Sequence, residues 1–410
     1  MVDNDRIIKK YILLMVVIVL LVLIACGGLI YYVDPFFHYH APLQGFEYVV
    51  DNQLTQNPGM AEHMDYDSVI LGSSMTVNFE TDWFKELMDL NTLKLSYSSA
   101  YPKDIANILD KIYNPDSKSS ENIKKVFLGV DIVTYSGDVN ETKYPLPKYL
   151  YDQNPINDIK YLLNKDVLLN YVIRPIVAPE PMNLSHIYAS WWTDEYYNEE
   201  WVLRNHDAIL TQNPDTMDSH GFDEGIMRNL NANIIPYIEA HPETEFVIFF
   251  PPYSILFWND AIMDGHLEAS LNSYKCIADA LNKYDNVKMY FFPVMAETVT
   301  DLNNYADYTH YHPSVNRYMV ECFVNDTYVI KKAGGRDEKD VIDEKDEICA
   351  ENADTGEEAN EVEVKADAKE VEANEVDANG TIDKYIQKMQ EMINGYDFET
   401  LRGKIREYRF

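Results

Sequence analysis

This 410-residue chain has few basic residues and few cysteines. Its 34 lysines and arginines face 68 aspartates and glutamates, which gives a formal net charge of −34. So large a negative charge repels nucleic-acid phosphates and excludes a nucleic-acid partner. The cysteines Cys26, Cys276, Cys322 and Cys349 are too few for a disulfide framework. Only Cys276 and Cys322 could pair inside a folded domain.

The acidic excess is concentrated near the C-terminus. Residues 337–377 contain 18 acidic residues and 4 lysines, a net charge of −14, and almost no aromatic residues. This composition cannot bury enough apolar surface to offset chain entropy, so we predict a disordered acidic loop over 335–380. Calcium binding there is an alternative, although the loop signature with glycine is missing. Residues 381–410 are predicted to be helical, with Thr381 as N-cap and an apolar face that packs back on the domain.

A single long apolar run stands near the N-terminus. Residues 11–33 are 23 residues without a charge, long enough to cross a bilayer as a helix. Basic residues precede the run and Asp34 follows it, so residues 1–10 are expected in the cytoplasm and the rest outside the cell. Cleavage as a lipoprotein at Cys26 is an alternative, but the residues after Cys26 continue apolar.

Apolar strands alternate with helical patterns over the middle of the chain. Strands are expected at 67–71, 92–96, 126–130, 245–250 and 287–291, and helices at 74–90, 102–113 and 267–284. This alternation predicts a mostly parallel sheet in a flavodoxin-like three-layer α/β/α sandwich. The α/β domain is placed at 66–334, after a stalk at 34–65. An aromatic-rich insertion at 140–235 is expected on the carboxyl edge of the sheet, where its rings pack in the core or stack on sugars.

Two short motifs carry the groups of a serine acyl-transfer site. Gly72-Ser73-Ser74 follows the first strand, and Asp307-Tyr308-Thr309-His310 follows the last. A serine hydroxyl needs a histidine to take its proton, and a carboxylate orients that histidine. Asp307, His310 and His312 could instead bind a metal, but no third His or Cys stands at a recognisable spacing. We therefore expect neither a metal nor a cofactor.

The order of these motifs resembles the SGNH, or GDSL-type, esterase and lipase superfamily over about residues 65–325. The resemblance implies that Ser74 is the nucleophile, His310 the general base and Asp307 its orienting partner. With its anchor, the chain is most similar to the D-alanine transfer proteins of teichoic-acid modification and to alginate O-acetylation proteins. That similarity implies a membrane-bound O-acyltransferase as partner.

Two blocks depart from the family pattern. The family's second block has a glycine whose N–H helps to form the oxyanion hole, but here Ser98 and Ser99 occupy the stretch. The third block, Gly-x-Asn, ends in Asp131, and an ionised aspartate cannot donate a hydrogen bond. Ser74, Ser99, Asn78 and Asp131 are therefore the oxyanion-hole candidates, unless Asp131 is turned away or a partner completes the hole.

The expected function is a membrane-anchored, extracytoplasmic serine acyltransferase or esterase. It would act on O-acyl groups of an envelope polysaccharide or a teichoic-acid-like polymer. Transfer and hydrolysis differ only in the acceptor, so both stay open. The alternative is an envelope scaffold without chemistry that binds a glycan or a membrane-bound O-acyltransferase.

Overall fold

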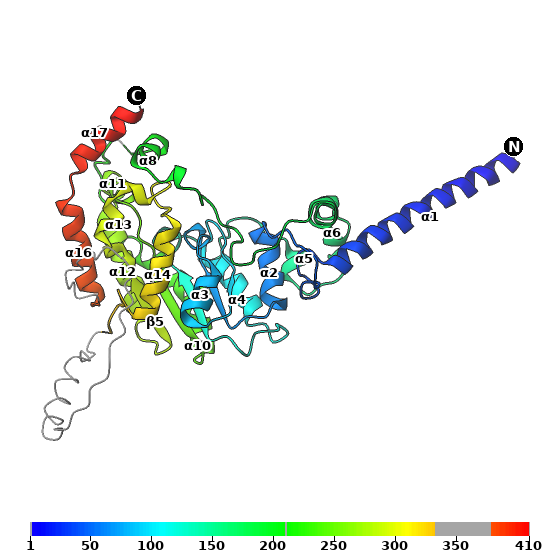
Figure 1. Ribbon diagram of the computed structural model, residues 1–410, viewed down its shortest axis with the longest axis horizontal. Helices are drawn as coiled ribbons and strands as arrows, with labels where there is room; N and C mark the ends of the chain where they lie inside the picture. Colours follow the sequence, from blue (N-terminus) through cyan, green and yellow to red (C-terminus); the bar gives the residue numbers. More distant parts are fainter. Residues whose placement is uncertain (1, 210, 333–378, 410) are drawn as a thin grey trace, which may run out of the picture.

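The computed structural model describes residues 2–209, 211–332 and 379–409. A long helix, α1 (Val2–Val33), projects from one side of an α/β domain, and the C-terminal helices lie on the opposite side (Figure 1). The 28 residues Arg6–Val33 of α1 are long and apolar enough to cross a membrane. They form the one helix of that kind within the described residues, as the sequence predicts.

The domain is built on a five-stranded sheet in which every pair of neighbouring strands is parallel. The strand order is β2-β1-β3-β4-β5. The strands are β1 (Ser68–Leu71), β2 (Thr92–Lys94), β3 (Lys125–Gly129), β4 (Glu245–Phe250) and β5 (Val287–Phe291). These bounds agree with the predicted strands to within two residues, because buried parallel strands are continuous apolar runs.

Helices fill the connections between the strands. Among them α4 contacts α2 and α9, α12 contacts α9 and α16, and α3 contacts α14. The helices are α2 (Gln53–His63), α3 (Thr81–Met88), α4 (Pro102–Ile112), α5 (Lys148–Tyr151), α6 (Ile159–Leu162), α7 (Arg174–Val177), α8 (Glu199–Asn205), α9 (Asp223–Asn233), α10 (Ile235–Ala240), α11 (Ile255–Met263), α12 (Leu267–Leu281), α13 (Ala296–Thr300), α14 (Pro313–Asn325), α16 (Ile382–Gly395) and α17 (Phe398–Arg409). Short 3-10 helices include η1 (Ser74–Thr76), and η3 (Val167–Ile173) is a π-helix.

The prediction of one helix over 74–90 is wrong. The chain forms η1, then an irregular stretch, and α3 begins only at Thr81. The Nζ of Lys94 donates hydrogen bonds to the carbonyl oxygens of Val77 and Phe79, at 2.8 Å each. Those carbonyls are bound by a side chain from β2 instead of by a following turn of helix.

The predicted stalk at 34–65 is instead part of the domain. Phe37 is fully buried, and α2 buries Met60 and Ala61 in the same hydrophobic core as the strands. A Cβ atom on Gly59 would lie 2.2 Å from the carbonyl oxygen of Phe36, so only glycine permits this close approach. The domain therefore begins where α1 ends.

The insertion predicted at 140–235 is shorter than expected. It lies between β3 and β4, but its last part is α9, which packs against α4 and α12. α9 is therefore an ordinary helix of the α/β domain, and the irregular, aromatic-rich part ends before Asp223.

The C-terminal helices pack on the domain, as predicted. Thr381 is the N-cap of α16, and its side chain accepts a hydrogen bond from the N–H of Lys384. Tyr385 stacks on Phe291 of β5 with ring centroids 5.2 Å apart. The predicted disordered loop at 335–380 lies outside the described residues apart from its last two, and Gly380 accepts a hydrogen bond from the N–H of Lys331.

The cysteines of the described chain are free thiols. Cys276 is half-buried and Cys322 is buried, and neither forms the bridge that the sequence allowed. Burial raises the pKa of Cys276 to about 11 and that of Cys322 to about 12, so both thiols stay protonated at neutral pH.

Candidate active site

The turn after β1 presents Ser74 at the carboxyl edge of the sheet. Gly72 has φ +143°, and a Cβ atom there would lie 2.7 Å from Cγ2 of Thr76. Ser73 then caps η1, because its hydroxyl accepts the N–H of Met75 at 3.2 Å. Glycine therefore permits the sharp turn, and the cap fixes the next residue, Ser74, at the start of η1.

His310 is held on a short loop that is closed by backbone pairing. Tyr305 and Tyr311 form an antiparallel bridge, and the N–H of Ala306 donates to the carbonyl of His310 at 2.8 Å. Inside the loop, Oδ1 of Asp307 accepts the backbone N–H groups of Thr309 and His310, at 2.8 Å each. The Asp-x-x-His spacing is therefore an aspartate-capped turn that fixes the carboxylate beside the ring.

The structure brings Ser74, His310 and Asp307 together. Nε2 of His310 lies 2.7 Å from Oγ of Ser74, and Nδ1 lies 2.6 Å from Oδ2 of Asp307. Burial alone would raise the pKa of Asp307, but the hydrogen bonds and charge of His310 outweigh it and lower the pKa to about 2. Asp307 is therefore ionised at neutral pH and can hold the proton on Nδ1, which leaves Nε2 free to accept the proton of Ser74.

Two side chains tie the histidine loop and α14 to the serine turn. The hydroxyl of Tyr311 donates to the carbonyl of Met75 at 3.0 Å, and Nδ2 of Asn316 reaches the same oxygen at 3.4 Å. Both side chains are buried. The distance between Ser74 and His310 is thus fixed by contacts other than their own hydrogen bond.

An aromatic residue of the insertion covers the histidine. The rings of Trp191 and His310 have centroids 4.3 Å apart and are tilted by 34°. Trp191 has φ +52°, and its carbonyl accepts a hydrogen bond of 2.6 Å from the hydroxyl of Tyr197. The sequence placed this aromatic cluster at the carboxyl edge of the sheet, but not Trp191 against the triad.

Backbone N–H groups of Ser74 and Ser99 are available as donors. Neither forms a hydrogen bond within the part of the chain that the structure describes. Ser99 has φ +59°, the left-handed conformation that glycine adopts most readily, so this turn tolerates a side chain where the SGNH pattern that the sequence resembles has glycine. The N–H of Ser98 is bound to Oε1 of Gln53 at 2.9 Å, which leaves Ser99 as the free donor of the pair.

The side-chain amide of Asn78 follows η1, four residues after Ser74. Its Oδ1 accepts the N–H of Ser190 at 2.9 Å, next to the residue that covers His310. No hydrogen bond of its Nδ2 is found among the described residues. Asn78 can therefore donate to a developing negative charge without breaking an existing bond.

Asp131 is buried and bonded, not turned out to solvent. The hydroxyl of Tyr253 donates to its Oδ1. Burial raises the pKa of Asp131, although Ser73, Tyr253 and the charge of His310 oppose the shift. Burial thus shifts Asp131 toward its protonated form, and only that form could donate a hydrogen bond to an oxyanion.

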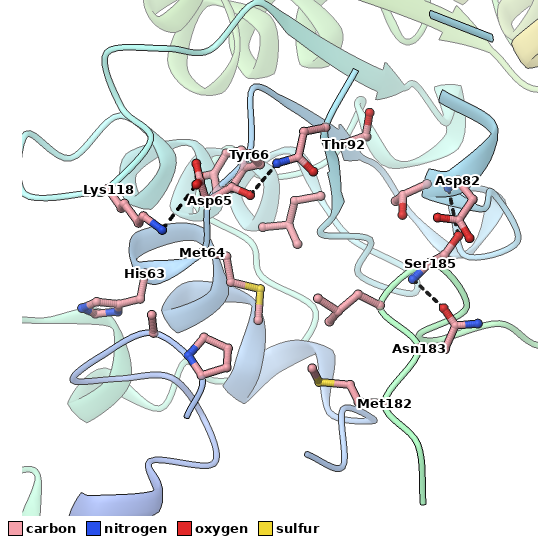
Figure 2. Close-up of a pocket in the computed structure, with 16 residues that line it drawn as sticks. His63, Met64, Asp65, Tyr66, Asp82, Thr92, Lys118, Met182, Asn183 and Ser185 are labelled. Carbon is pink, nitrogen blue, oxygen red and sulfur yellow. Dashed lines mark hydrogen bonds and ion pairs between the residues drawn. The ribbon is translucent and has the colours of Figure 1, made fainter. Parts of the chain in front are cut away.

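A cavity of about 530 Å³ lies elsewhere in the domain (Figure 2). Its lining includes Tyr66 and Thr92 at the amino ends of β1 and β2, together with Met182 and Ser185 from the insertion. The triad lies at the carboxyl end of β1, and none of its members lines this cavity. The cavity is therefore separate from the candidate active site.

The arrangement does not favour the metal alternative. His310 is bonded on both ring nitrogens, and Nε2 of His312 points to Asp194 at 3.2 Å. Among the described residues no group of three or more His, Cys, Asp or Glu side chains is placed to hold a metal ion.

No family model and no curated protein matches this sequence, so the function proposed below is inferred from the geometry of Ser74, His310 and Asp307.

Proposed function

We propose that this protein is an SGNH-type serine acyltransferase or esterase, anchored in the membrane with its domain outside the cell. The observation that carries the proposal is the hydrogen-bonded series Ser74–His310–Asp307, assembled from segments 236 residues apart. In this series, Nε2 of His310 faces Ser74 and can accept its proton, and the carboxylate of Asp307, which orients the histidine, is ionised.

In the proposed reaction Oγ of Ser74 attacks an acyl carbonyl and transfers its proton to Nε2 of His310. The carbonyl oxygen becomes an oxyanion, which the N–H groups of Ser74 and Ser99 and the amide of Asn78 stabilise. The tetrahedral intermediate collapses, the bond to the leaving oxygen breaks, and His310 returns the proton to that oxygen. An acceptor hydroxyl, or water, then attacks the acyl-serine in the same way and releases Ser74.

The fold and the anchor are consistent with this proposal. The strand order β2-β1-β3-β4-β5 is that of flavodoxin-like sheets, in which ligands bind at the carboxyl edge, and we propose the corresponding three-layer sandwich. Arg6, Lys9 and Lys10 precede the apolar span, so we place the N-terminus in the cytoplasm.

We propose an envelope polysaccharide or a teichoic-acid-like polymer as the acyl acceptor. Trp192, Trp201 and Tyr308 are exposed large aromatic residues, the first two in the insertion and the third inside the Asp-x-x-His loop. Exposed aromatic rings can stack on sugar faces. The resemblance to envelope acyl-transfer proteins supplies the proposed partner, a membrane-bound O-acyltransferase that passes acyl groups across the membrane.

Labelling with a fluorophosphonate probe tests the catalytic role of Ser74. Oγ of an activated serine attacks the phosphorus and expels fluoride, which leaves a stable covalent adduct. The full-length wild type in detergent should label, and Ser74→Ala and His310→Ala should not. Ser120→Ala is the matched control, because the hydroxyl of Ser120 donates to the carbonyl of Ser117 on the loop before β3, contacts no member of the triad, and should leave labelling in place. Labelling that persists in Ser74→Ala would refute the proposal.

A scaffold without chemistry is the second candidate, favoured by the buried carboxyl of Asp131 where the family has a donor amide. In a host that lacks the protein, a scaffold carrying Ser74→Ala would restore normal O-acylation of the envelope. An enzyme carrying it would not.

A further inference from the structure

A group of exposed apolar side chains lies in residues 156–177, which comprise α6, η3 and α7. Ile156 is 83% exposed and Val177 is 77% exposed. Five more apolar side chains of the segment are also exposed: Ile159, Leu163, Leu169, Ile173 and Ile176. Single exposed apolar residues are common on soluble proteins, but a group of this size marks an interaction surface.

The segment 156–177 packs directly beside the membrane-spanning helix. Both α6 and η3 contact α1, and Figure 1 shows α6 beside the end of α1 that joins the domain. A Cβ atom on Gly27 would lie 3.4 Å from the carbonyl oxygen of Leu162 and from Cδ2 of Leu163. Gly27 is six residues before the end of α1, roughly 9 Å along the helix axis. The segment therefore extends alongside the apolar part of α1.

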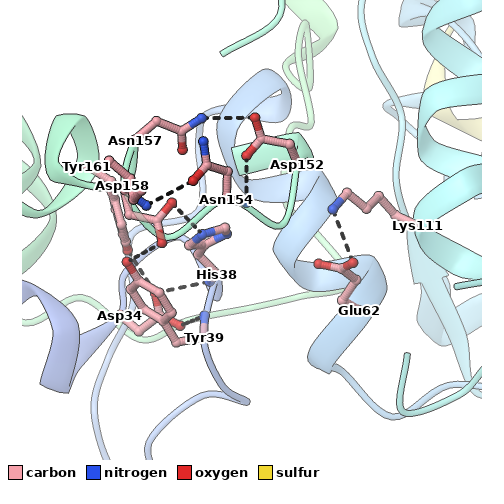
Figure 3. A network of polar contacts seen from close by, with 11 residues as sticks. Asp34, His38, Tyr39, Glu62, Lys111, Asp152, Asn154, Asn157, Asp158 and Tyr161 are labelled. Atoms are coloured by element: carbon pink, nitrogen blue, oxygen red, sulfur yellow. Dashed lines mark hydrogen bonds and ion pairs between the residues drawn. The ribbon is translucent and has the colours of Figure 1, made fainter. Parts of the chain in front are cut away.

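A buried polar network fixes the segment to the end of α1 (Figure 3). The hydroxyl of Tyr161 in α6 donates to Oδ1 of Asp34 at 2.9 Å and accepts the N–H of Phe36 at 3.0 Å. Asp34 also accepts the N–H groups of His38, at 3.0 Å, and Tyr39, at 2.6 Å. Because Asp34 directly follows α1, the depth of the helix in the bilayer sets the height of the segment.

The charge of the segment is opposite to that of the chain. Between residues 156 and 177, Lys160, Lys165 and Arg174 face two acidic residues, Asp158 and Asp166, a net charge of +1 in a chain of −34, and Asp158 is buried. All three basic side chains are exposed. Exposed apolar residues mixed with lysine and arginine are the composition of segments that lie in a membrane interface.

We infer that residues 156–177 lie in the headgroup and upper acyl region of the leaflet from which α1 emerges, with anionic phospholipids as the occupant of their apolar face. The inference rests on α1 spanning the membrane and is independent of the chemistry at Ser74. Together, α1 and the segment hold the domain at two points, so the domain cannot swing freely about the end of α1.

Photocrosslinking of the wild-type full chain tests this inference. The protein is reconstituted in phosphatidylcholine–phosphatidylglycerol vesicles that contain a phospholipid with a diazirine in its acyl chain, and adducts are mapped by peptide mass spectrometry. Adducts are expected in α1 and in peptides of 156–177, but not in α14, whose exposed Val324 is the matched control. Adducts confined to α1 would overturn the inference and indicate that water or another protein covers the segment.

A double variant shows whether the apolar face makes the contact. Leu169→Asp with Ile176→Asp changes two exposed side chains, so the fold is expected to be kept. The adduct yield in 156–177, relative to that in α1, should fall severalfold. An unchanged ratio would overturn the inference, because lipid contact that persists after two charges are added does not depend on the exposed apolar side chains.

Discussion

Lys94 gives the sharpest physical prediction, because it is a lysine with no exposed surface that binds the stretch of chain following the candidate nucleophile. Its Nζ donates to the carbonyls of Val77 and Phe79, three and five residues after Ser74. Burial lowers the pKa of Lys94 from 10.5 to about 7, and the nearby charge of Glu80 offsets only part of the shift. A neutral amine keeps two N–H donors, so both hydrogen bonds survive deprotonation.

The sign of the pH dependence follows from the lowered pKa. Between pH 7 and 10.5 the unfolded chain keeps the lysine proton and the folded protein has lost it, so stability rises with pH. The shift of about 3.5 pKa units corresponds to about 5 kcal/mol against the charged form, at 1.36 kcal/mol for each unit. From pH 7 to pH 9 the free energy of unfolding should therefore rise by about 2 kcal/mol from this residue.

Thermal unfolding of the full chain in detergent at pH 7 and pH 9 measures this effect. From pH 7 to pH 9, the Tm of the wild type should rise relative to the Tm of Lys94→Met, which has no titratable group at this position. Lys148→Met removes an exposed lysine and should keep the wild-type pH dependence. If the Tm of the wild type and that of Lys94→Met changed with pH in the same way, the reasoning would be refuted, because Lys94 would then have the same pKa in the folded and unfolded states.

Three further variants test other contacts. In the wild type, ester hydrolysis should decrease as pH rises through the raised pKa of Asp131, because the ionised carboxylate cannot donate a hydrogen bond. Asp131→Asn supplies a donor at every pH, so this decrease should be missing from the pH–rate profile of the variant. Identical profiles for the wild type and the variant would contradict a protonated Asp131. Tyr311→Phe removes a tether to the carbonyl of Met75 and should cost about 1 kcal/mol of stability and lower kcat severalfold, measured by thermal unfolding and ester turnover; unchanged turnover would contradict a positioning role. Asp34→Asn weakens the hydrogen bonds that Asp34 accepts, including that from Tyr161, and should lower stability by about 3 kcal/mol in thermal unfolding. An unchanged Tm would contradict the conclusion that this network fixes residues 156–177 to the end of α1.

The sequence predicts the parts of this fold that depend on local patterns. The five strands are continuous apolar runs, and Thr381 is a side-chain N-cap, so neither needs knowledge of distant residues. The triad is also local in its parts: Gly72 makes the turn before Ser74, and the Asp-x-x-His spacing lets Asp307 bind the backbone of its own loop.

The features that the sequence misses depend on contacts between distant segments. Lys94 ends the helical pattern after Ser74 because a strand 17 residues later supplies a donor to Val77. Trp191 reaches His310 across more than a hundred residues of chain, and no local spacing encodes that contact. A lysine inside an apolar strand and a Trp-Trp pair were the visible signals, but neither identifies its contact partner.

In the proposed reaction, the weakest part of the site is the oxyanion hole. Tyr311 ties the histidine loop to the serine turn, so Ser74 and His310 are already in hydrogen-bond contact and need no rearrangement to transfer a proton. Asp131 can add a donor only in its protonated form, so once it ionises the proposed oxyanion hole consists of Ser74, Ser99 and Asn78 alone. Loss of one oxyanion donor costs on the order of a hundredfold or more in rate. If the enzyme is slow, mutations that add a donor should therefore raise kcat more than any mutation that tightens the triad.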